Sequence, residues 1–155
     1  MAIEPGSKAP SFSMPTDGGG KIASKDLKGK KVVLYFYPKD DTSGCTREAI
    51  DFTAKADAFK KAGAVVIGCS RDDPKSHDKF KAKHNLGITL AADVDGQVTE
   101  AYGVWVEKSM YGRKYMGIER ATFLIDEAGK VRQVWRKVKV PGHVDEVLAA
   151  VKALD

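Results

Sequence analysis

Two short segments, residues 32–37 and 65–69, constrain the fold of this chain more than any other feature. Both are almost wholly apolar and rich in β-branched or aromatic residues. Such segments are typical of strands that are covered on both faces, as in a parallel or mixed sheet. Between them the apolar positions recur at intervals of three and four, which predicts a helix that Gly63 ends. These positions are Ala49, Phe52, Ala56 and Phe59.

The following segments continue this alternation of strands and helices. A helix is predicted to begin at Asp72 or Asp73, with Pro74 in its first turn. Residues 88–104 predict a short strand, a turn at Asp95–Gly96 and a short helix. A parallel pairing of the strands follows, because strand–helix–strand units favour it.

The two ends of the chain complete the pattern. Residues 121–126 and 131–135 predict a hairpin that turns through Ala128 and Gly129, and residues 142–155 predict a closing helix. Near the start, residues 16–21 predict a turn between two short extended pieces. We therefore expect an α/β fold with three α/β/α layers and a mixed central sheet, and the thioredoxin-like fold has this composition of elements.

Length and charge exclude several classes of protein. The 155 residues suit one domain, residues 1–155, and the longest apolar runs are far too short to span a bilayer. The net charge of +5 is spread along the chain, so we expect a solvated surface and no nucleic-acid partner. The start, “MAIEPGSKAPSF”, has no secretory pattern, which predicts a cytoplasmic location without membrane attachment.

Cys45 is one of only two cysteines, and it stands where strand 32–37 gives way to a helix. It lies in the polar turn “DDTSGCT”, which favours a functional thiol over a packed one. A helix N-terminus has partial positive charge and free N–H groups that favour a thiolate. Gly44 lets the backbone approach closely, Thr42 can direct its hydroxyl toward the sulfur or its substrate, and Pro38 can limit access of water.

Spacing excludes several other thiol chemistries. A Cys-x-x-Cys oxidoreductase would need cysteine where Glu48 stands, and a Cys-x5-Arg phosphatase would need arginine where Asp51 stands. No zinc-ligand spacing is present. A cysteine hydrolase would need a histidine partner, which the sequence alone does not exclude. The three histidines are predicted to have surface or capping roles: His77, His84 and His143.

The segment “YPKDDTSGCT” resembles the peroxidatic motif Pro-x-x-x-Thr-x-x-Cys of peroxiredoxins, at Pro38, Thr42 and Cys45. The match is closest to the bacterioferritin comigratory protein, or PrxQ, group. The resemblance extends over nearly the whole chain, through “GSKAPSF”, “VIGCSRDDPKSHDKF”, “DVDGQVTEAYGVW”, “GIERATFLID” and “KVKVPGHVDEVL”.

The resemblance implies a chemistry for these residues. The Cys45 thiolate would attack a peroxide and become a sulfenic acid. Thr42 would align the peroxide, and the N–H groups of Gly44 and Cys45 would stabilise developing charge on oxygen. No metal, haem or flavin is implied.

An arginine from a distant strand belongs to the same chemistry in the family. The segment “GIERATFLID” has Arg120 at the matching position, where a guanidinium would stabilise the thiolate and bind peroxide oxygens. Without the resemblance, the residues alone would favour a surface ion pair of Arg120 with Glu48 or Glu119.

Two departures from the family pattern bear on the mechanism. Ser43 replaces a frequent proline, which would alter the rigidity of the turn. Ile50 stands where many relatives have a resolving cysteine, and residues 72–86 contain none. Cys69 is predicted to be a packed residue, because a free cysteine at the end of a buried strand is usually part of the core. A bridge to Cys45 would need Cα atoms within about 7 Å and an unwound first helix. We therefore expect one-cysteine behaviour, with a Cys45–Cys69 disulfide as the second possibility.

The leading hypothesis is a thiol peroxidase that reduces hydrogen peroxide and alkyl hydroperoxides, an antioxidant role in cell redox homeostasis. Its expected reductants are thioredoxin, glutaredoxin or a low-molecular-weight thiol, and the resemblance implies a monomer. A second hypothesis is a peroxide-sensing signalling protein that turns over slowly. A basic nucleic-acid-binding protein is the weakest, and would bind with a steep salt dependence.

Overall fold

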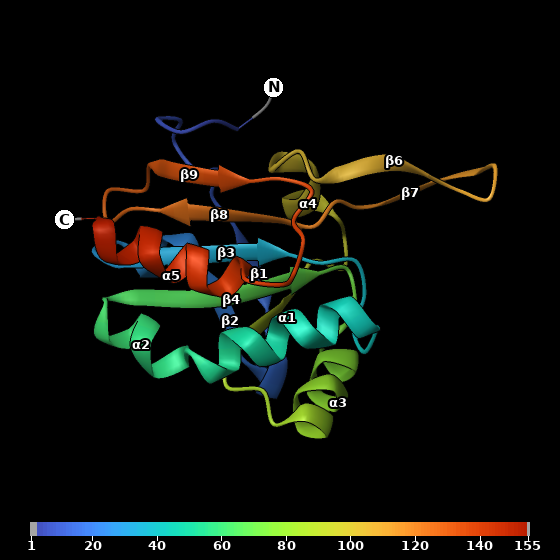
Figure 1. The fold of residues 1–155 in the computed structure, drawn as a ribbon, viewed down its shortest axis with the longest axis horizontal. Coiled ribbons are helices and arrows are strands. Elements are labelled where there is room, and N and C mark those ends of the chain that lie inside the picture. The colour runs from blue at the N-terminus through green and yellow to red at the C-terminus, as the bar shows by residue number, and fades with distance from the viewer. Residues whose placement is uncertain (1–2, 155) are drawn as a thin grey trace.

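A mixed five-stranded sheet lies at the centre of the protein, as described by a computed structural model of residues 3–154 (Figure 1). The strand order is β5-β4-β3-β8-β9. The strands are β1 (Ser13–Pro15), β2 (Lys21–Ala23), β3 (Lys31–Phe36), β4 (Ala64–Ser70), β5 (Thr89–Ala92), β6 (Trp105–Met110), β7 (Arg113–Ile118), β8 (Ala121–Ile125) and β9 (Val131–Trp135). The α-helices are α1 (Ser43–Ala54), α2 (Ala56–Lys61), α3 (Pro74–His84), α4 (Gln97–Ala101) and α5 (His143–Ala153).

Strand β3 is central because it has a partner on each side. It pairs in parallel with β4 and antiparallel with β8, while β5 pairs in parallel with β4 and β9 antiparallel with β8. All residues of β3 after Lys31 are buried. This double coverage explains why the sequence is apolar throughout this segment, and the expected mixed sheet is confirmed.

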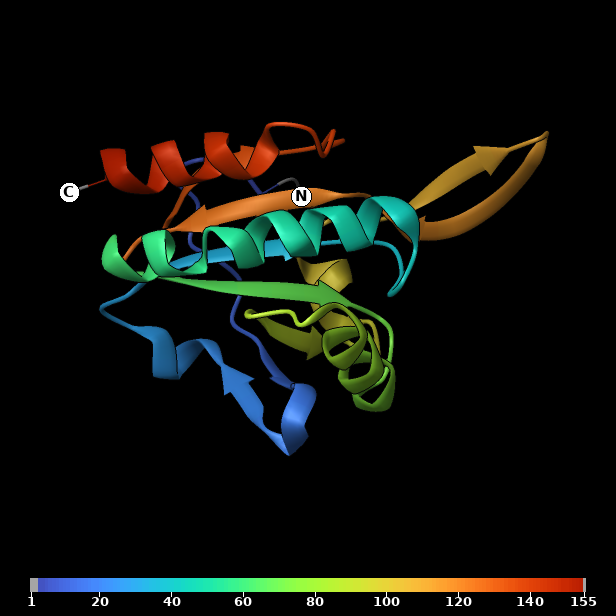
Figure 2. The same ribbon diagram turned by 60° about the horizontal axis from the view of Figure 1, so that its bottom comes forward.

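The two faces of the sheet are covered by different elements (Figure 2). Helices α1, α2 and α5 lie over one face, and their core includes Tyr35, Phe52 and Val147. The N-terminal strands β1 and β2 and helix α4 lie on the other side, where the core includes Phe36 and Tyr102. Because side chains alternate along a strand, consecutive residues of β3 belong to opposite cores. These are the three layers of the thioredoxin-like fold that the sequence predicts.

Most predicted boundaries agree with the structure. Helix α3 begins at Pro74, and the Asp73 side chain caps it by accepting a hydrogen bond from the Ser76 N–H at 2.8 Å. Gly63 follows the end of α2 with a positive φ of 81°. The helix predicted through Phe59 is instead two helices, because the backbone leaves helical geometry at Lys55 (φ −105°, ψ 9°). None of the helices in the described part of the chain is long and apolar enough to cross a membrane.

One element has no counterpart in the sequence prediction. Strands β6 and β7 pair antiparallel with each other and form a separate two-stranded hairpin, which projects from one end of the molecule (Figure 1). Its residues are mostly exposed on both faces. It therefore lacks the alternation of apolar and polar residues that marks a half-buried strand.

Candidate functional site

Cys45 is the third residue of α1, in the first turn after the N-cap residue Thr42. The Thr46 N–H bonds the Thr42 carbonyl at 2.8 Å and closes this turn. The earlier N–H groups of a helix have no acceptor within the helix, so they can stabilise negative charge. The thiol is only 2% exposed, so charge on the sulfur or on a bound oxygen would be shielded from water.

Arg120 connects the start of β8 to the Cys45 sulfur. Its Nη2 donates to Cys45 Sγ at 3.3 Å. The same nitrogen lies 3.1 Å from the position that a Cβ would occupy on Gly44. A side chain at residue 44 would therefore crowd the guanidinium, which gives a physical reason for glycine beside the thiol. This contact favours a negatively charged sulfur because a guanidinium keeps its charge.

Glu48 binds the nitrogen of the Arg120 guanidinium that does not contact the sulfur. Glu48 was not predicted as a site residue from the sequence. Arg120 Nη1 donates to Glu48 Oε1 at 2.6 Å, and the Glu48 side chain is fully buried. Burial raises the pKa of Glu48 to about 7, although the Arg120 charge opposes this. Arg120 thus makes both the ion pair and the sulfur contact that the sequence treated as alternatives.

Two buried oxygens beside this cluster have no hydrogen-bond partner within residues 3–154: Glu48 Oε2 and the Tyr35 hydroxyl. Burial raises the pKa of Tyr35 well above its ordinary value, and the charges of Glu48 and Cys45 act in the same direction. Unpaired buried oxygens are rare and costly, and both of these belong to residues that lie on the same side of the sheet as Cys45.

Thr42 and Pro38 lie on the exposed side of the thiol. The Thr42 hydroxyl donates to the Lys39 carbonyl at 2.9 Å and closes the turn before α1. Since a hydroxyl has one donor hydrogen, this leaves its lone pairs free to accept a hydrogen bond. Pro38 is exposed two residues after β3 ends.

The loop that carries these residues is fastened by Asp40, which is buried and was not predicted as a site residue. Its Oδ1 accepts from the Tyr37 hydroxyl at 2.6 Å, and its Oδ2 accepts from the Ser76 hydroxyl at 2.8 Å. Its backbone N–H donates to Asp72 at 2.9 Å. Helix α3 thereby fixes the path of the chain into α1.

His77 is the buried partner of this carboxylate. Its Nδ1 lies 2.7 Å from Asp40 Oδ2 and its Nε2 lies 2.8 Å from the Ala91 carbonyl. Both neighbours are acceptors, so the ring satisfies both when it is doubly protonated. Burial lowers the pKa of His77, but the Asp40 hydrogen bond and charge outweigh burial and raise it overall.

The predicted surface or capping role is therefore wrong for His77. It is also wrong for His143, which is buried and whose Nε2 lies 2.8 Å from the Thr122 hydroxyl oxygen. His84 fits the prediction, because it lies near the surface 2.9 Å from Asp41. A packed histidine is not visible in the sequence because its burial depends on long-range contacts.

Cys69 lies on the other side of the central sheet. It belongs to the core that contains Phe36 and Met14, whereas Cys45 belongs to the core that contains Tyr35. Its sulfur lies 3.6 Å from Met14 Sδ, and the side chain has no exposed surface. Burial raises the pKa of Cys69 well above its ordinary value. The sheet separates the two thiols, so the structure does not favour a disulfide between them.

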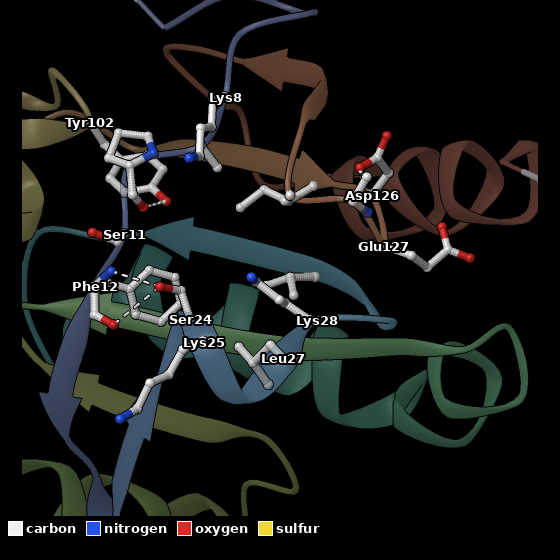
Figure 3. A pocket seen from close by; sticks show the side chains of 16 residues that line it. Lys8, Ser11, Phe12, Ser24, Lys25, Leu27, Lys28, Tyr102, Asp126 and Glu127 are labelled. Atoms are coloured by element: carbon white, nitrogen blue, oxygen red, sulfur yellow. Dashed lines mark hydrogen bonds between the residues drawn. The ribbon is translucent and has the colours of Figure 1, made fainter.

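One cavity elsewhere on the molecule is unrelated to this site. It has a volume of about 380 Å³ and lies between the N-terminal segment, the turn that contains Ser24 and the β8–β9 turn (Figure 3). Its labelled side chains include Phe12, Tyr102 and Asp126, and Cys45 is not among its lining residues. No group of three or more His, Cys, Asp or Glu side chains in residues 3–154 could hold a metal ion.

The arrangement around Cys45 suits nucleophilic attack by sulfur on a bond between two oxygens. The helix N–H groups and the guanidinium can stabilise charge on the oxygen that leaves, and the thioredoxin-like sheet brings them together from distant parts of the chain. These features define the class of cysteine-based thiol peroxidases.

The comparisons with known proteins identify the family. Residues 5–134 match the AhpC/TSA family. Peroxiredoxin Bcp of Bacillus subtilis is 49% identical over 152 residues, which cover 98% of this chain and 97% of that protein. Peroxiredoxin Bcp of Escherichia coli is 43% identical over 150 residues, covering 97% and 96%. The chain belongs to the AhpC/TSA family and is a peroxiredoxin of the bacterioferritin comigratory protein (PrxQ) group.

Solved structures agree with this assignment. Xanthomonas campestris Peroxiredoxin Q superimposes with a TM-score of 0.89 at 46% identity, covering 99% of this chain and 96% of that one. A mutant of Xylella fastidiosa PrxQ gives a TM-score of 0.93 at 38% identity, covering 99% and 98%. The family confirms the predicted fold and the predicted class of enzyme.

Proposed function

We propose that this peroxiredoxin reduces hydrogen peroxide and alkyl hydroperoxides through Cys45, in a cycle that uses one cysteine of its own chain. Alkyl peroxide reduction is described for the Xanthomonas campestris bacterioferritin comigratory protein, which is 45% identical to this chain and has a TM-score of 0.89. It covers 99% of this chain, and the match covers 97% of that protein. The observation that carries the proposal is the 3.3 Å contact between Arg120 Nη2 and the Cys45 sulfur.

In the first half of the cycle, the Cys45 thiolate attacks the nearer peroxide oxygen. A sulfur–oxygen bond forms, the oxygen–oxygen bond breaks, and the leaving oxygen takes a proton and departs as water or an alcohol. Sulfur is oxidised to a sulfenic acid and the peroxide is reduced. Arg120 and the N–H groups of Gly44 and Cys45 stabilise charge on the oxygens as the bond breaks.

Thr42 orients the peroxide in this proposal. Because its hydroxyl hydrogen is used by the Lys39 carbonyl, its oxygen accepts a hydrogen bond from the peroxide O–H. Glu48 and its ion pair keep the Arg120 guanidinium in position. Pro38 covers the site and limits the access of water to Cys45.

In the second half of the cycle, an external thiol reduces the sulfenic acid. The reductant is thioredoxin, glutaredoxin or a small thiol, because Cys69 lies behind the sheet and no other cysteine is present. A thiolate of the reductant attacks the Cys45 sulfur and releases water, and a second reductant thiol then breaks the mixed disulfide. We further propose that residues 1–155 act as one monomeric, cytoplasmic domain without a nucleic-acid or membrane partner.

Coupled turnover tests this proposal. Thioredoxin, thioredoxin reductase and NADPH should support sustained oxidation of NADPH when cumene hydroperoxide or hydrogen peroxide is added. A stoichiometric oxidation of Cys45 followed by only slow oxidation of NADPH would instead indicate the peroxide-sensing alternative, which the similarity to peroxiredoxins does not favour.

A further inference from the structure

The β6–β7 hairpin carries most of the exposed apolar side chains of the described chain. Six large apolar residues of residues 3–154 are prominently exposed, and four of them lie on this hairpin: Met110, Tyr111, Tyr115 and Met116. Two-stranded hairpins are only marginally stable alone, and this one is held mainly at its base. There Ile118 is buried in the core, and the Arg71 guanidinium lies 3.4 Å from the ring centre of Trp105.

The loop at the tip of the hairpin contains a residue type that its backbone conformation disfavours. Tyr111 and Gly112 form the two-residue loop, with positive φ values of 52° and 77°. Asn-Gly or Asp-Gly is the usual choice for such a loop, because large L-residues are strained at positive φ. Tyr111 is nevertheless aromatic and 98% exposed. It contributes nothing to the core, so a contact outside this chain accounts for it best.

The base of the hairpin lies at the end of the sheet where the helix that carries Cys45 begins. Strand β7 ends at Ile118, two residues before Arg120, and both ribbon views show the hairpin leaving the same end of the sheet at which α1 begins (Figures 1 and 2). The Lys108 side chain runs back over Gly117, with its Cδ 3.2 Å from the position of an added Cβ. Burial lowers the pKa of Lys108, Arg120 lowers it further, and Cys45 opposes this.

The charges of the hairpin indicate which partner it suits. It has three cationic side chains, Lys108, Arg113 and Lys114, and one carboxylate, Glu107. A second copy of this chain would bring a net charge of +5 against this cationic surface. An acidic partner would be attracted, and exposed Tyr, Met and Arg are the residue types enriched at protein interfaces.

We propose that the β6–β7 hairpin is the docking surface for the reductant, and that its occupant is a thiol protein with an acidic surface around its reactive cysteine. The inference rests on the proposed one-cysteine cycle, in which an external thiol must reach Cys45. The aromatic tip and the Met side chains supply apolar contact, while Lys108, Arg113 and Lys114 orient the acidic partner so that its thiolate faces the sulfenic acid.

The test compares two reductants with one peroxide. The protein probe is a thioredoxin of net negative charge, recycled by its reductase and NADPH, and the small probe is dithiothreitol. The variant Arg113→Glu/Lys114→Glu should lower kcat/KM for thioredoxin by about 10-fold or more and leave the dithiothreitol-driven rate unchanged. The matched control is Lys60→Glu/Lys61→Glu, the same charge change on exposed residues of α2. It should leave both rates unchanged.

A second variant separates docking from folding. Tyr111→Asn creates the favoured Asn-Gly loop, so it should preserve the hairpin while removing the aromatic contact. It should lower the thioredoxin-dependent kcat/KM several-fold, whereas Val94→Ser, at an apolar residue that is 60% exposed outside the hairpin, should not.

Three results would overturn the docking proposal. They are full thioredoxin activity in both hairpin variants, equal losses with dithiothreitol, or dimers of the wild type that Arg113→Glu/Lys114→Glu dissociates. Failure of the proposed function would look different, because the wild type would then consume no peroxide even with dithiothreitol.

Discussion

The two cysteines of this chain lie in opposite environments. They are nevertheless close along the backbone network, because the Cys69 carbonyl accepts a hydrogen bond from the N–H of Tyr37, which is eight residues before Cys45. Cys45 meets a guanidinium, a helix N-terminus and a polar loop. Cys69 meets Met14 and apolar side chains on the far face of the sheet, where burial raises its pKa. Both are almost fully buried, so charge and hydrogen-bond donors, rather than exposure, separate the reactive thiol from the packed one.

Exchanging each thiol for a hydroxyl should have the largest effect. Cys45→Ser should reduce peroxide consumption by on the order of 10⁴- to 10⁶-fold, the scale seen when a catalytic nucleophile is removed. Cys69→Ser should leave the first oxidation intact. Peroxide loss measured under single-turnover conditions checks both, and comparable losses in the two variants would show that Cys69 takes part.

Removing the guanidinium should have the next largest effect. Arg120→Met keeps much of the side-chain volume but removes the donor at the sulfur, and it should lower the rate constant of peroxide reduction by about 10²- to 10³-fold. Stopped-flow measurement of Cys45 oxidation gives this constant. Arg132→Met is a matched control, because Arg132 is half exposed and pairs with Asp126 away from the thiol. A wild-type rate in Arg120→Met would contradict the proposed role.

The raised pKa of Glu48 should make the free energy of unfolding depend on pH. Burial raises its pKa from 4.5 to about 7, so the folded protein holds this proton over a range in which the unfolded chain has lost it. This group therefore lowers the free energy of unfolding as pH rises from about 4.5 to 7. Glu48→Gln should remove that slope. Urea unfolding at several pH values tests this, and parallel curves for wild type and variant would contradict it.

His77 should also make the free energy of unfolding fall as pH rises, but in a higher range of pH than Glu48. Its pKa is raised in the fold, so its contribution to stability is complete below about 6.5 and is lost as pH rises through the folded value. His77→Gln should therefore destabilise the protein most at low pH, by about 1–3 kcal/mol, because it leaves Asp40 without its charged partner. His84→Gln is the more exposed control, and a loss independent of pH would point to packing alone.

The smallest expected effect is that of trimming the packed thiol. Cys69→Ala should lower the free energy of unfolding by about 1–2 kcal/mol, because it leaves a small void beside Met14. Thermal unfolding measures it. An increase in stability would show that the sulfur is not well packed.

The sequence predicts those features that depend on local pattern. The buried strands β3 and β4, the Pro74 helix start and the Cys45 turn are set by short-range signals, and the resemblance adds Arg120. Glu48, Asp40 and His77 are not predictable in this way, because each acquires its role from a residue more than thirty positions away. The β6–β7 hairpin is not predicted from the sequence for another reason: most of its residues are exposed on both faces, so the sequence shows no alternation of apolar and polar residues.

The most direct test of the account is the intact mass of the reduced protein after one equivalent of peroxide, with and without a trap for sulfenic acid. The account predicts a trapped adduct on Cys45 with Cys69 still a free thiol. Loss of both thiols without an adduct would contradict it, because the two sulfurs would then have joined across the sheet.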